Sequence, residues 1–392
     1  MSTGFQLAER FAGVTTSPVR DILAVANRDD VISFAGGIPD ASLFELDDFR
    51  DAYDHVLTHQ GRRALQYAST QGEPELLEQV AARMSRHLPT TAAQVQVTSG
   101  SQEGIFLVGQ TLTDPGDVVL VEQPTYLAAV QAFALAGARL VAVETDEHGM
   151  LPDALDAAIA THRPKFVYLI PTFQNPTGRS MPIDRRREVA EVLLRTGVPL
   201  LEDDPYGELR FEGSPAAPLA SLPGMSAQTV LLNSASKVMA PGVRIGWLRA
   251  EGPILRSLEI AKQAVGLQSA VTDQLAVARY LSSCDLDAHI AHVIEVYRVR
   301  RDAMVDGLVR RLPDGATLTR PEGGMFVWAC LGDGTDTAAM LPAAVAAGVA
   351  YVPGWPFFAS DPDHSAMRLS FVTNSPEVIE EGLDRLGRAL SW

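Results

Sequence analysis

Short apolar runs recur along residues 95–248, and most of them alternate with stretches of helical spacing. That spacing predicts helices at 104–112, 152–160 and 184–195, and another helix that follows Tyr126 and ends at residue 136. Strands that are buried on both faces of a parallel sheet read as continuous apolar runs. We therefore predict an α/β domain built on a mostly parallel seven-stranded sheet with helices on both sides. The predicted strands are 95–98, 118–121, 140–143, 166–170, 200–202, 230–232 and 243–248.

The pattern changes on either side of this region. Helical spacing appears at 46–59 and 73–87 before it, and two long helical stretches follow it, 253–281 and 286–312. The remainder mixes strands with helices, which predicts a smaller α+β domain. We expect a short strand at 31–34 to join the N-terminal segment to that domain. The predicted organisation is an arm and part of the small domain at 1–45, a large domain at 46–285 and a C-terminal small domain at 286–392, with strands at 325–329, 349–352 and 367–371 and helices at 338–347 and 376–390.

Charge and cysteine usage narrow the function classes. The 392 residues include 32 Lys and Arg against 48 Asp and Glu, a formal net charge of −16. Binding to nucleic acid needs a basic surface, so we expect no nucleic-acid partner. Cys284 and Cys330 are isolated in the sequence, which predicts neither a disulfide framework nor a metal site and fits a reducing, cytoplasmic setting. No run approaches about 18 apolar residues, and the first residues lack the apolar core of a secretory leader, so we expect no membrane span.

Polar residues gather just beyond the predicted strands. In open α/β sheets, ligands bind in the crevice outside the carboxyl ends of the strands. Polar side chains that recur at those ends are hard to explain as scattered surface residues, and we therefore expect them to form one site. The candidates are Ser101, Tyr126, Asn175, Asp203, Tyr206, Ser234, Ser236 and Lys237.

The stretch Ser234-Ala235-Ser236-Lys237 places an amine beside two hydroxyls, directly after a strand. Arg244 adds a fixed cation that suits a phosphate. A lysine beside a phosphate site can form a Schiff base with a phosphorylated aldehyde such as pyridoxal 5′-phosphate. Taken alone, the motif is also compatible with a solvated lysine in a serine-rich turn. The decision depends on whether the chain supplies the other parts of that cofactor site.

Each of those parts has a candidate. Lys237 would form the internal aldimine and then move protons, and Asp203 would hold the pyridine nitrogen protonated. Arg368, in a strand of the small domain, is a candidate clamp for a substrate α-carboxylate, with a surface arginine as the alternative. The remaining candidates are Asn175 and Tyr206 for the phenolic oxygen, Tyr126 for stacking on the ring, and Ser101, Gln102, Ser234, Ser236 and Arg244 for the phosphate.

The N-terminal segment holds two further candidates. Ser17-Pro18 is typical of a helix start and places Arg20 in the first helical turn, where it could bind an anion or simply pair with a nearby acid. Gly36 and Gly37 end the short strand at 31–34. Glycines there allow a close approach of the backbone to another group, although they could equally form only a turn.

Together these residues resemble the fold-type I pyridoxal-phosphate aminotransferases of class I and II, over almost the whole chain from Ser17 onward. The similarity is greatest to the group of 2-aminoadipate aminotransferase and kynurenine aminotransferase II, through Ser17-Pro18-Val19-Arg20 and Phe34-Ala35-Gly36-Gly37-Ile38-Pro39. One residue departs from that group, because Ala235 stands where an aromatic residue is usual. The other motifs that carry the resemblance are Tyr67-x4-Gly72, Gly100-Ser101-Gln102, Pro124-Thr125-Tyr126, 171–178, Glu202-Asp203-Asp204-Pro205-Tyr206, Ser234-Ala235-Ser236-Lys237, Arg244-Ile245-Gly246-Trp247 and Arg368.

The resemblance implies a fold, a reaction and an assembly. It implies a homodimer with shared active sites, in which Tyr67 reaches the cofactor phosphate of the neighbouring subunit. It places Gly37 and Arg20 near the substrate side chain, where Arg20 could meet a distal carboxylate. The implied activity is ping-pong transfer of an amino group between an L-amino acid and a 2-oxo acid in amino acid metabolism, with glutamate and 2-oxoglutarate as one pair.

Two alternatives remain at this point. The same cofactor site could serve elimination, decarboxylation or oxidation, because these reactions share their early steps. The chain could also be a non-catalytic regulator that binds the cofactor. The complete set of Lys237, Asp203 and Arg368 favours an enzyme, and no winged-helix segment is evident before the domain.

Overall fold

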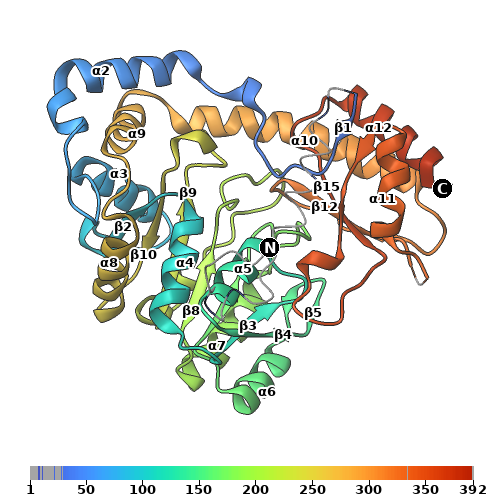
Figure 1. The fold of residues 1–392 in the computed structure, drawn as a ribbon, viewed down its shortest axis with the longest axis horizontal. Helices are drawn as coiled ribbons and strands as arrows, with labels where there is room; N and C mark the ends of the chain where they lie inside the picture. The colour runs from blue at the N-terminus through green and yellow to red at the C-terminus, as the bar shows by residue number, and fades with distance from the viewer. Residues whose placement is uncertain are drawn as a thin grey trace, which may run out of the picture.

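The computed structural model describes Ala8, Phe11, Ile22, Arg28 and residues 30–332 and 334–390. Its central feature is a seven-stranded sheet in the order β2-β10-β9-β8-β7-β3-β4 (Figure 1). All neighbours are parallel except β10, which runs antiparallel to both β9 and β2. The predicted α/β class and mostly parallel sheet are confirmed. The strands are β2 (Val95–Thr98), β3 (Val118–Glu122), β4 (Arg139–Val143), β7 (Phe166–Leu169), β8 (Leu200–Asp203), β9 (Thr229–Ser234) and β10 (Gly246–Arg249).

Alternate residues of these strands face different helices, as the pleat requires. Val119 and Val121 pack in a cluster with residues of α4, α5 and α8, whereas Val118 and Leu120 pack in a cluster with residues of α6 and α7. Both layers exclude water, so the sheet is a rigid base for the groups at its ends. The helices of this large domain are α2 (Leu46–Ala64), α3 (Pro74–Met84), α4 (Ser101–Leu112), α5 (Leu127–Leu135), α6 (Pro152–His162), α7 (Ile183–Thr196), α8 (Pro253–Gly266) and α9 (Val271–Ser283).

The C-terminal part forms a second, four-stranded antiparallel sheet in the order β11-β12-β15-β14. The residues of β1 pair with β13, so the segment at 32–33 lies against C-terminal chain more than 300 residues later. Figure 1 shows the long helix α10 running between the two sheet regions. The elements are β1 (Ile32–Ser33), α10 (Leu286–Arg311), β11 (Thr317–Leu318), β12 (Phe326–Cys330), α11 (Thr337–Ala346), β13 (Val349–Ala350), β14 (Val352–Pro353), β15 (Ala366–Ser370) and α12 (Pro376–Leu390), with the short pair β5 (Thr145–Asp146) and β6 (Gly149–Met150) near the large sheet.

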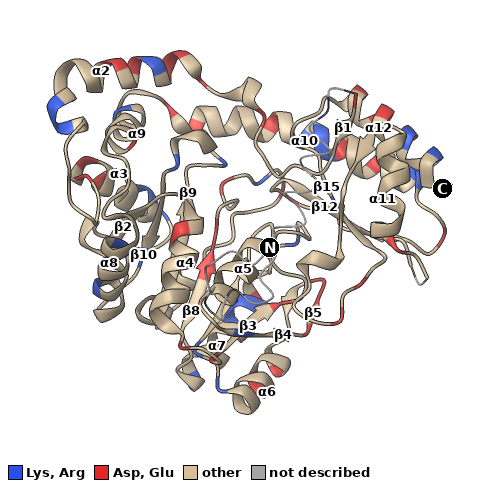
Figure 2. Cartoon of the chain, viewed as in Figure 1, with Lys and Arg blue, Asp and Glu red and all other residues tan. Residues whose placement is uncertain are grey.

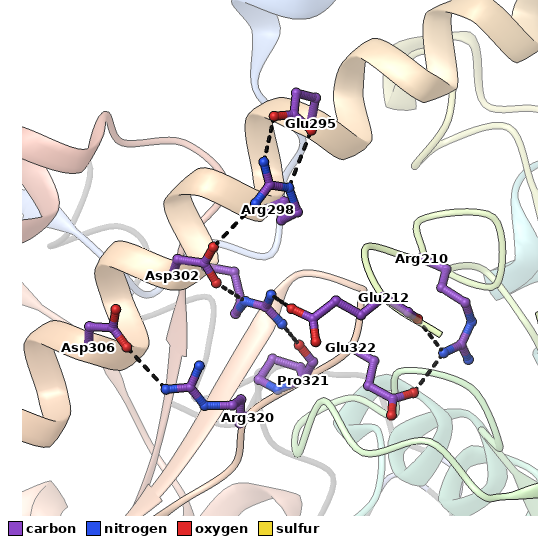
Figure 3. A network of polar contacts seen from close by, with 10 residues as sticks. Arg210, Glu212, Glu295, Arg298, Asp302, Asp306, Arg320, Pro321 and Glu322 are labelled. Atoms are coloured by element: carbon purple, nitrogen blue, oxygen red, sulfur yellow. Dashed lines mark hydrogen bonds and ion pairs between the residues drawn. The ribbon is translucent and has the colours of Figure 1, made fainter. Parts of the chain in front are cut away.

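Charged side chains connect α10 with two neighbouring loops and connect those loops with each other (Figure 3). Arg210 donates to Glu322 at 2.7 Å, and Arg320 pairs with Asp306 of α10 at 3.0 Å. The fully buried Arg301 of α10 binds both Glu212 and the carbonyl of Pro321. This network therefore holds the loop after β8 against the segment that leads into β12.

Three predicted elements are wrong in detail. The stretch 253–281 is two helices, because the backbone leaves the helical conformation at Leu267, which adopts φ 65°. The side chain of the next residue, Gln268, accepts a hydrogen bond from the Ala68 amide at 2.5 Å. The strand at 349–352 is split at Tyr351, where the chain changes partner from β1 to β15. The strand at 243–248 begins only at Gly246, since Pro241–Val243 forms a 3-10 turn that ends in Arg244 at φ 50°.

Other observations bear on the sequence-based expectations. Helix α4 begins at Ser101, three residues before the predicted start, so its N-terminus reaches the end of the sheet. Figure 2 shows that acidic and basic residues are interspersed along α2 and α12. None of the described helices combines the length and apolar character that a membrane crossing needs. The helix start predicted at Ser17 lies outside the described residues.

Candidate active site

A cavity of about 290 Å³ lies at the carboxyl ends of the central strands, where residues of the second sheet close it. Phe326 of β12 and Arg368 of β15 contribute from that second sheet, and Gly37 contributes from the segment after β1. The sequence candidates that line it are Gly37, Ser101, Gln102, Tyr126, Asn175, Asp203, Tyr206, Ser234, Ser236, Lys237, Arg244 and Arg368.

Lys237 follows β9 and extends its amine into this cavity. Its Nζ donates a hydrogen bond to the carbonyl of Gly37 at 3.0 Å. Burial lowers the pKa of Lys237 to about 8, and the positive charges of Arg368 and Arg244 act in the same direction, against the attraction of Asp203. An amine with that pKa is partly neutral near neutral pH, as a nucleophile or base must be.

Asp203 ends β8 with its carboxylate inside the protein. Oδ2 accepts a hydrogen bond from the Tyr168 hydroxyl at 2.9 Å, while Oδ1 is buried and has no partner among the described residues. Burial raises the pKa of Asp203 to about 7; Asp204 adds to the rise, whereas Tyr168 and Lys237 oppose it. Because an unpaired buried carboxylate oxygen is costly, Oδ1 is suited to a ligand that brings a proton or a positive charge.

The end of the cavity nearest α4 is built for an anion. Ser101 begins that helix, whose first backbone N–H groups have no partner within the helix. The Arg244 guanidinium lies beside this turn and donates to the carbonyl of Ser99 at 2.8 Å. Gly100 has φ 80°, and a Cβ atom there would lie 2.2 Å from Arg244 Nη2, so only glycine lets the arginine approach this closely. Ser234 and Ser236 line the same cavity.

Arg368 also lines this cavity. Its Nη1 donates to Asn175 Oδ1 and its Nη2 to the carbonyl of Ala35, both at 2.9 Å. Nε is buried and unpartnered within the described part of the chain. The guanidinium lies between two rings, 4.3 Å from the centroid of Phe326 and 5.0 Å from that of Phe357. Burial lowers the pKa of Arg368 to about 10, which leaves it cationic at neutral pH.

Aromatic residues and amides complete the walls. The Asn175 amide donates to the Tyr206 hydroxyl at 3.3 Å, and Tyr126 is the N-cap residue of α5. Burial raises the pKa of Tyr126 to about 12 and also raises that of Tyr206, so both phenols are protonated donors at neutral pH. Gln102 donates to the carbonyl of Ala128 at 3.1 Å and keeps its Oε1 unpartnered among the described residues.

The model of the family described as aminotransferase class I and II matches residues 29–386. The chain belongs to this family. It is 40% identical over 390 residues to aromatic-amino-acid aminotransferase 1 of Thermococcus litoralis, covering 98% of this chain and 93% of that protein. It is 37% identical over 383 residues to the 2-aminoadipate transaminase of Thermus thermophilus, covering 96% and 94%.

A solved structure gives the same result and adds a ligand. The α-aminoadipate aminotransferase of Thermus thermophilus, complexed with N-(5′-phosphopyridoxyl)-L-leucine, matches with a TM-score of 0.92 at 36% identity over 98% of this chain and 97% of that one. This protein is accordingly a pyridoxal-phosphate-dependent aminotransferase. The cavity suits the cofactor, since the α4 corner can take a phosphate and Asp203 Oδ1 can face a pyridine nitrogen.

Two sequence candidates of this aminotransferase remain, Tyr67 and Arg20. Tyr67 is 78% exposed and does not line the cavity. Arg20 lies outside the described residues, so its predicted contact with a distal carboxylate stays a prediction. The sequence reasoning missed Tyr168 and Phe326. A tyrosine in an otherwise apolar strand was the available signal for Tyr168, because a buried hydroxyl needs a partner; Phe326 gave no local signal.

Proposed function

We propose that this aminotransferase moves an amino group between an L-amino acid and a 2-oxo acid, with glutamate and 2-oxoglutarate as one pair, in two half-reactions. The observation that carries the proposal is the placement of the Lys237 amine and the buried Arg368 guanidinium on one cavity. The pKa of Lys237 is lowered in part by Arg368, which reflects how close the two cations are. A base that stands near a carboxylate clamp is suited to act on the α-carbon of an amino acid.

Each group then has a task. Bound pyridoxal phosphate supplies an aldehyde that can carry the amino group and a ring that withdraws electrons. Lys237 holds the aldehyde carbon and, once free, moves the proton at the substrate α-carbon. Arg368 binds the α-carboxylate with its unpartnered Nε as one donor, which fixes the orientation of that carbon. The other roles are protonation of the pyridine nitrogen for Asp203, hydrogen bonds to the phenolic oxygen for Asn175 and Tyr206, stacking on the ring for Tyr126, and phosphate binding for Ser101, Gln102, Ser234, Ser236 and Arg244.

We also propose that the enzyme works as a homodimer whose two sites are shared. Several large apolar side chains are exposed on the loop after α2 and on α8, among them Leu65, Ile260, Val265 and Leu267. Tyr67 lies in the same loop, which the Gln268 side chain holds at Ala68. A second copy of the chain would bury this surface and bring Tyr67 to the phosphate of the other subunit.

The proposed domain bounds remain 1–45 with the small domain, 46–285 and 286–392. Support comes from β1, which pairs with β13 of the C-terminal part, and from the break between α9 and α10 at 284–285.

Absorption spectroscopy of the holoenzyme tests the proposed reaction. L-glutamate should convert the bound cofactor from its aldehyde form to its amine form and release one 2-oxoglutarate per site, which an oxo-acid assay measures. Adding a 2-oxo acid should restore the first spectrum. Lys237→Ala should bind the cofactor but lose turnover by at least about a thousandfold. Lys165→Ala, at an exposed lysine that pairs with Asp117, is the control. A spectrum that glutamate leaves unchanged would reject glutamate as the donor.

A further inference from the structure

The Tyr168 hydroxyl is bonded to the Asp203 carboxylate across two neighbouring parallel strands, β7 and β8. Tyr168 is in register with Leu201, so Asp203 stands two residues further along the same face of the sheet. A tyrosine side chain is long enough to reach that diagonal position. Its hydroxyl donates to Asp203 Oδ2 at 2.9 Å, and both residues are buried. The sheet itself therefore sets the geometry of this contact.

The contact distinguishes the two oxygens of Asp203. Oδ2 is engaged by Tyr168, whereas Oδ1 is buried without a partner in the described part of the chain, on a residue that lines the cavity. A carboxylate held by one oxygen loses the freedom to rotate its other oxygen away. Because the donor on Oδ2 is a neutral phenol, it stabilises the carboxylate without neutralising its charge.

We propose that Tyr168 is a positioning residue of the aminotransferase reaction: it fixes the Asp203 carboxylate so that Oδ1 faces the pyridine nitrogen of pyridoxal phosphate and keeps that nitrogen protonated. Because the assignment rests on the proposed role of Asp203, the two are tested together. Tyr168 touches neither substrate nor cofactor in this arrangement and acts only through Asp203.

The surroundings support such a role. Burial and the neighbouring Asp204 both raise the pKa of Asp203, and the bond from Tyr168 and the charge of Lys237 are what oppose them. Burial raises the pKa of Tyr168 most, and the neighbouring Asp203, Tyr126 and Glu122 raise it further. The Tyr168 hydroxyl is therefore a protonated donor at neutral pH. The hydrogen bond from Tyr168 is thus one of the two interactions that favour the charged form of Asp203.

The chain offers a clean substitution and a matched control. The Tyr168 ring packs edge-on against Phe133 at a centroid distance of 5.5 Å, so Tyr168→Phe keeps the packing and removes one oxygen. Tyr53 of α2 also donates to an aspartate, Asp273, at 2.6 Å and does not line the cavity. Tyr53→Phe therefore removes the same kind of bond elsewhere.

Two measurements on the holoenzyme test the assignment. The first is the dissociation constant of pyridoxal phosphate, and the second is the pH titration of the cofactor's isotope-labelled pyridine nitrogen by NMR. Without the Tyr168 hydroxyl the ion pair between Asp203 and the pyridinium is weakened. We expect Tyr168→Phe to weaken binding about tenfold and to move the pyridinium titration about one unit to lower pH. Tyr53→Phe should match the wild type in both.

The double variant with Asp203→Asn separates the possible failures. If Tyr168 acts through Asp203, Tyr168→Phe should change neither measurement further in the Asp203→Asn background. If Asp203→Asn alters both values and Tyr168→Phe alters neither, the positioning role is overturned and the role of Asp203 stands. If Asp203→Asn alters neither, both roles fall. Should Tyr168→Phe not fold, Tyr168→Met, which also lacks the hydroxyl, takes its place.

Discussion

The guanidinium of Arg368 and the side-chain amide of Asn175 are joined by a 2.9 Å hydrogen bond, although 193 residues separate them in the chain. Arg368 belongs to β15 of the small sheet, and Asn175 to the loop that follows β7 of the large one. Asn175 in turn donates to the Tyr206 hydroxyl at 3.3 Å. The proposed substrate clamp and the proposed cofactor contacts therefore form one connected set.

Arg368→Lys should weaken substrate binding more than it slows the chemical step. A lysine keeps the charge but cannot bond Asn175, the Ala35 carbonyl and a carboxylate in one plane. We expect the KM for glutamate to rise about ten- to a hundredfold, in line with the loss of a bond to a charged group. Steady-state kinetics measures this, with Arg256→Lys on the exposed face of α8 as the control. An unchanged KM would remove Arg368 from the substrate site.

Gly100→Ala should weaken phosphate binding beside Arg244 at the N-terminus of α4. Its Cβ would lie 2.2 Å from Arg244 Nη2, so the arginine must move. Gly116→Ala is a matched control, because Gly116 has a similar positive φ of 93° with nothing within 4 Å of the added atom. Both variants should lose about 1 kcal/mol of stability from backbone strain. Only Gly100→Ala should also weaken cofactor binding, by about tenfold. If the two variants bind the cofactor with equal affinity in a titration, the proposed phosphate site beside Gly100 and Arg244 is contradicted.

Asp203→Asn should stabilise the apoenzyme at alkaline pH. The pKa of Asp203 is raised from 3.8 to about 7, so the folded state binds more protons than the unfolded state between these values. Stability therefore falls as pH rises through this window, and asparagine escapes the loss. We expect the variant to gain on the order of 3 kcal/mol at pH 8, and clearly less at pH 5.5.

Urea unfolding of the two apoenzymes at matched concentration measures that difference. Asp184→Asn, at an exposed residue near the start of α7, is the control for removing a carboxylate elsewhere. A gain for Asp203→Asn that is the same at both pH values would show that burial of the charge is not its cause.

Hybrid dimers test the role of Tyr67. Tyr67→Phe and Lys237→Ala each impair a pure dimer. If Tyr67 serves the neighbouring subunit, a dimer with one chain of each kind has one intact site and one site with both changes. Such hybrids, purified with two different tags, should regain about half of the wild-type activity per dimer. Hybrids no more active than the Tyr67→Phe dimer would place Tyr67 in its own subunit's site.

The spacing of apolar residues along the chain correctly predicted the elements whose bounds depend on nearby residues alone. The strand at 95–98 and the helix at 376–390 have their predicted bounds, because apolar spacing and helix-start residues specify them directly. The prediction of one helix over 253–281 was wrong because a tertiary contact lies at the break, where the Gln268 side chain accepts a hydrogen bond from the Ala68 amide. The split at Tyr351 has the same kind of cause. Each half of that strand follows a different partner, one of them near residue 32.

The sequence by itself determined the order of strands and helices, the small-residue turn before α4, and the position of Lys237 just after a buried strand. These follow from spacing along the chain, which acts over a few residues. Only the tertiary structure decided that Arg368 meets Asn175, that the Gly37 carbonyl accepts from Lys237, and that Tyr168 engages one oxygen of Asp203 and leaves the other for the cavity. Those contacts join residues 35 to 200 positions apart, and either strand pairing within the large sheet or the packing of its end against the small domain sets them, rather than any local preference.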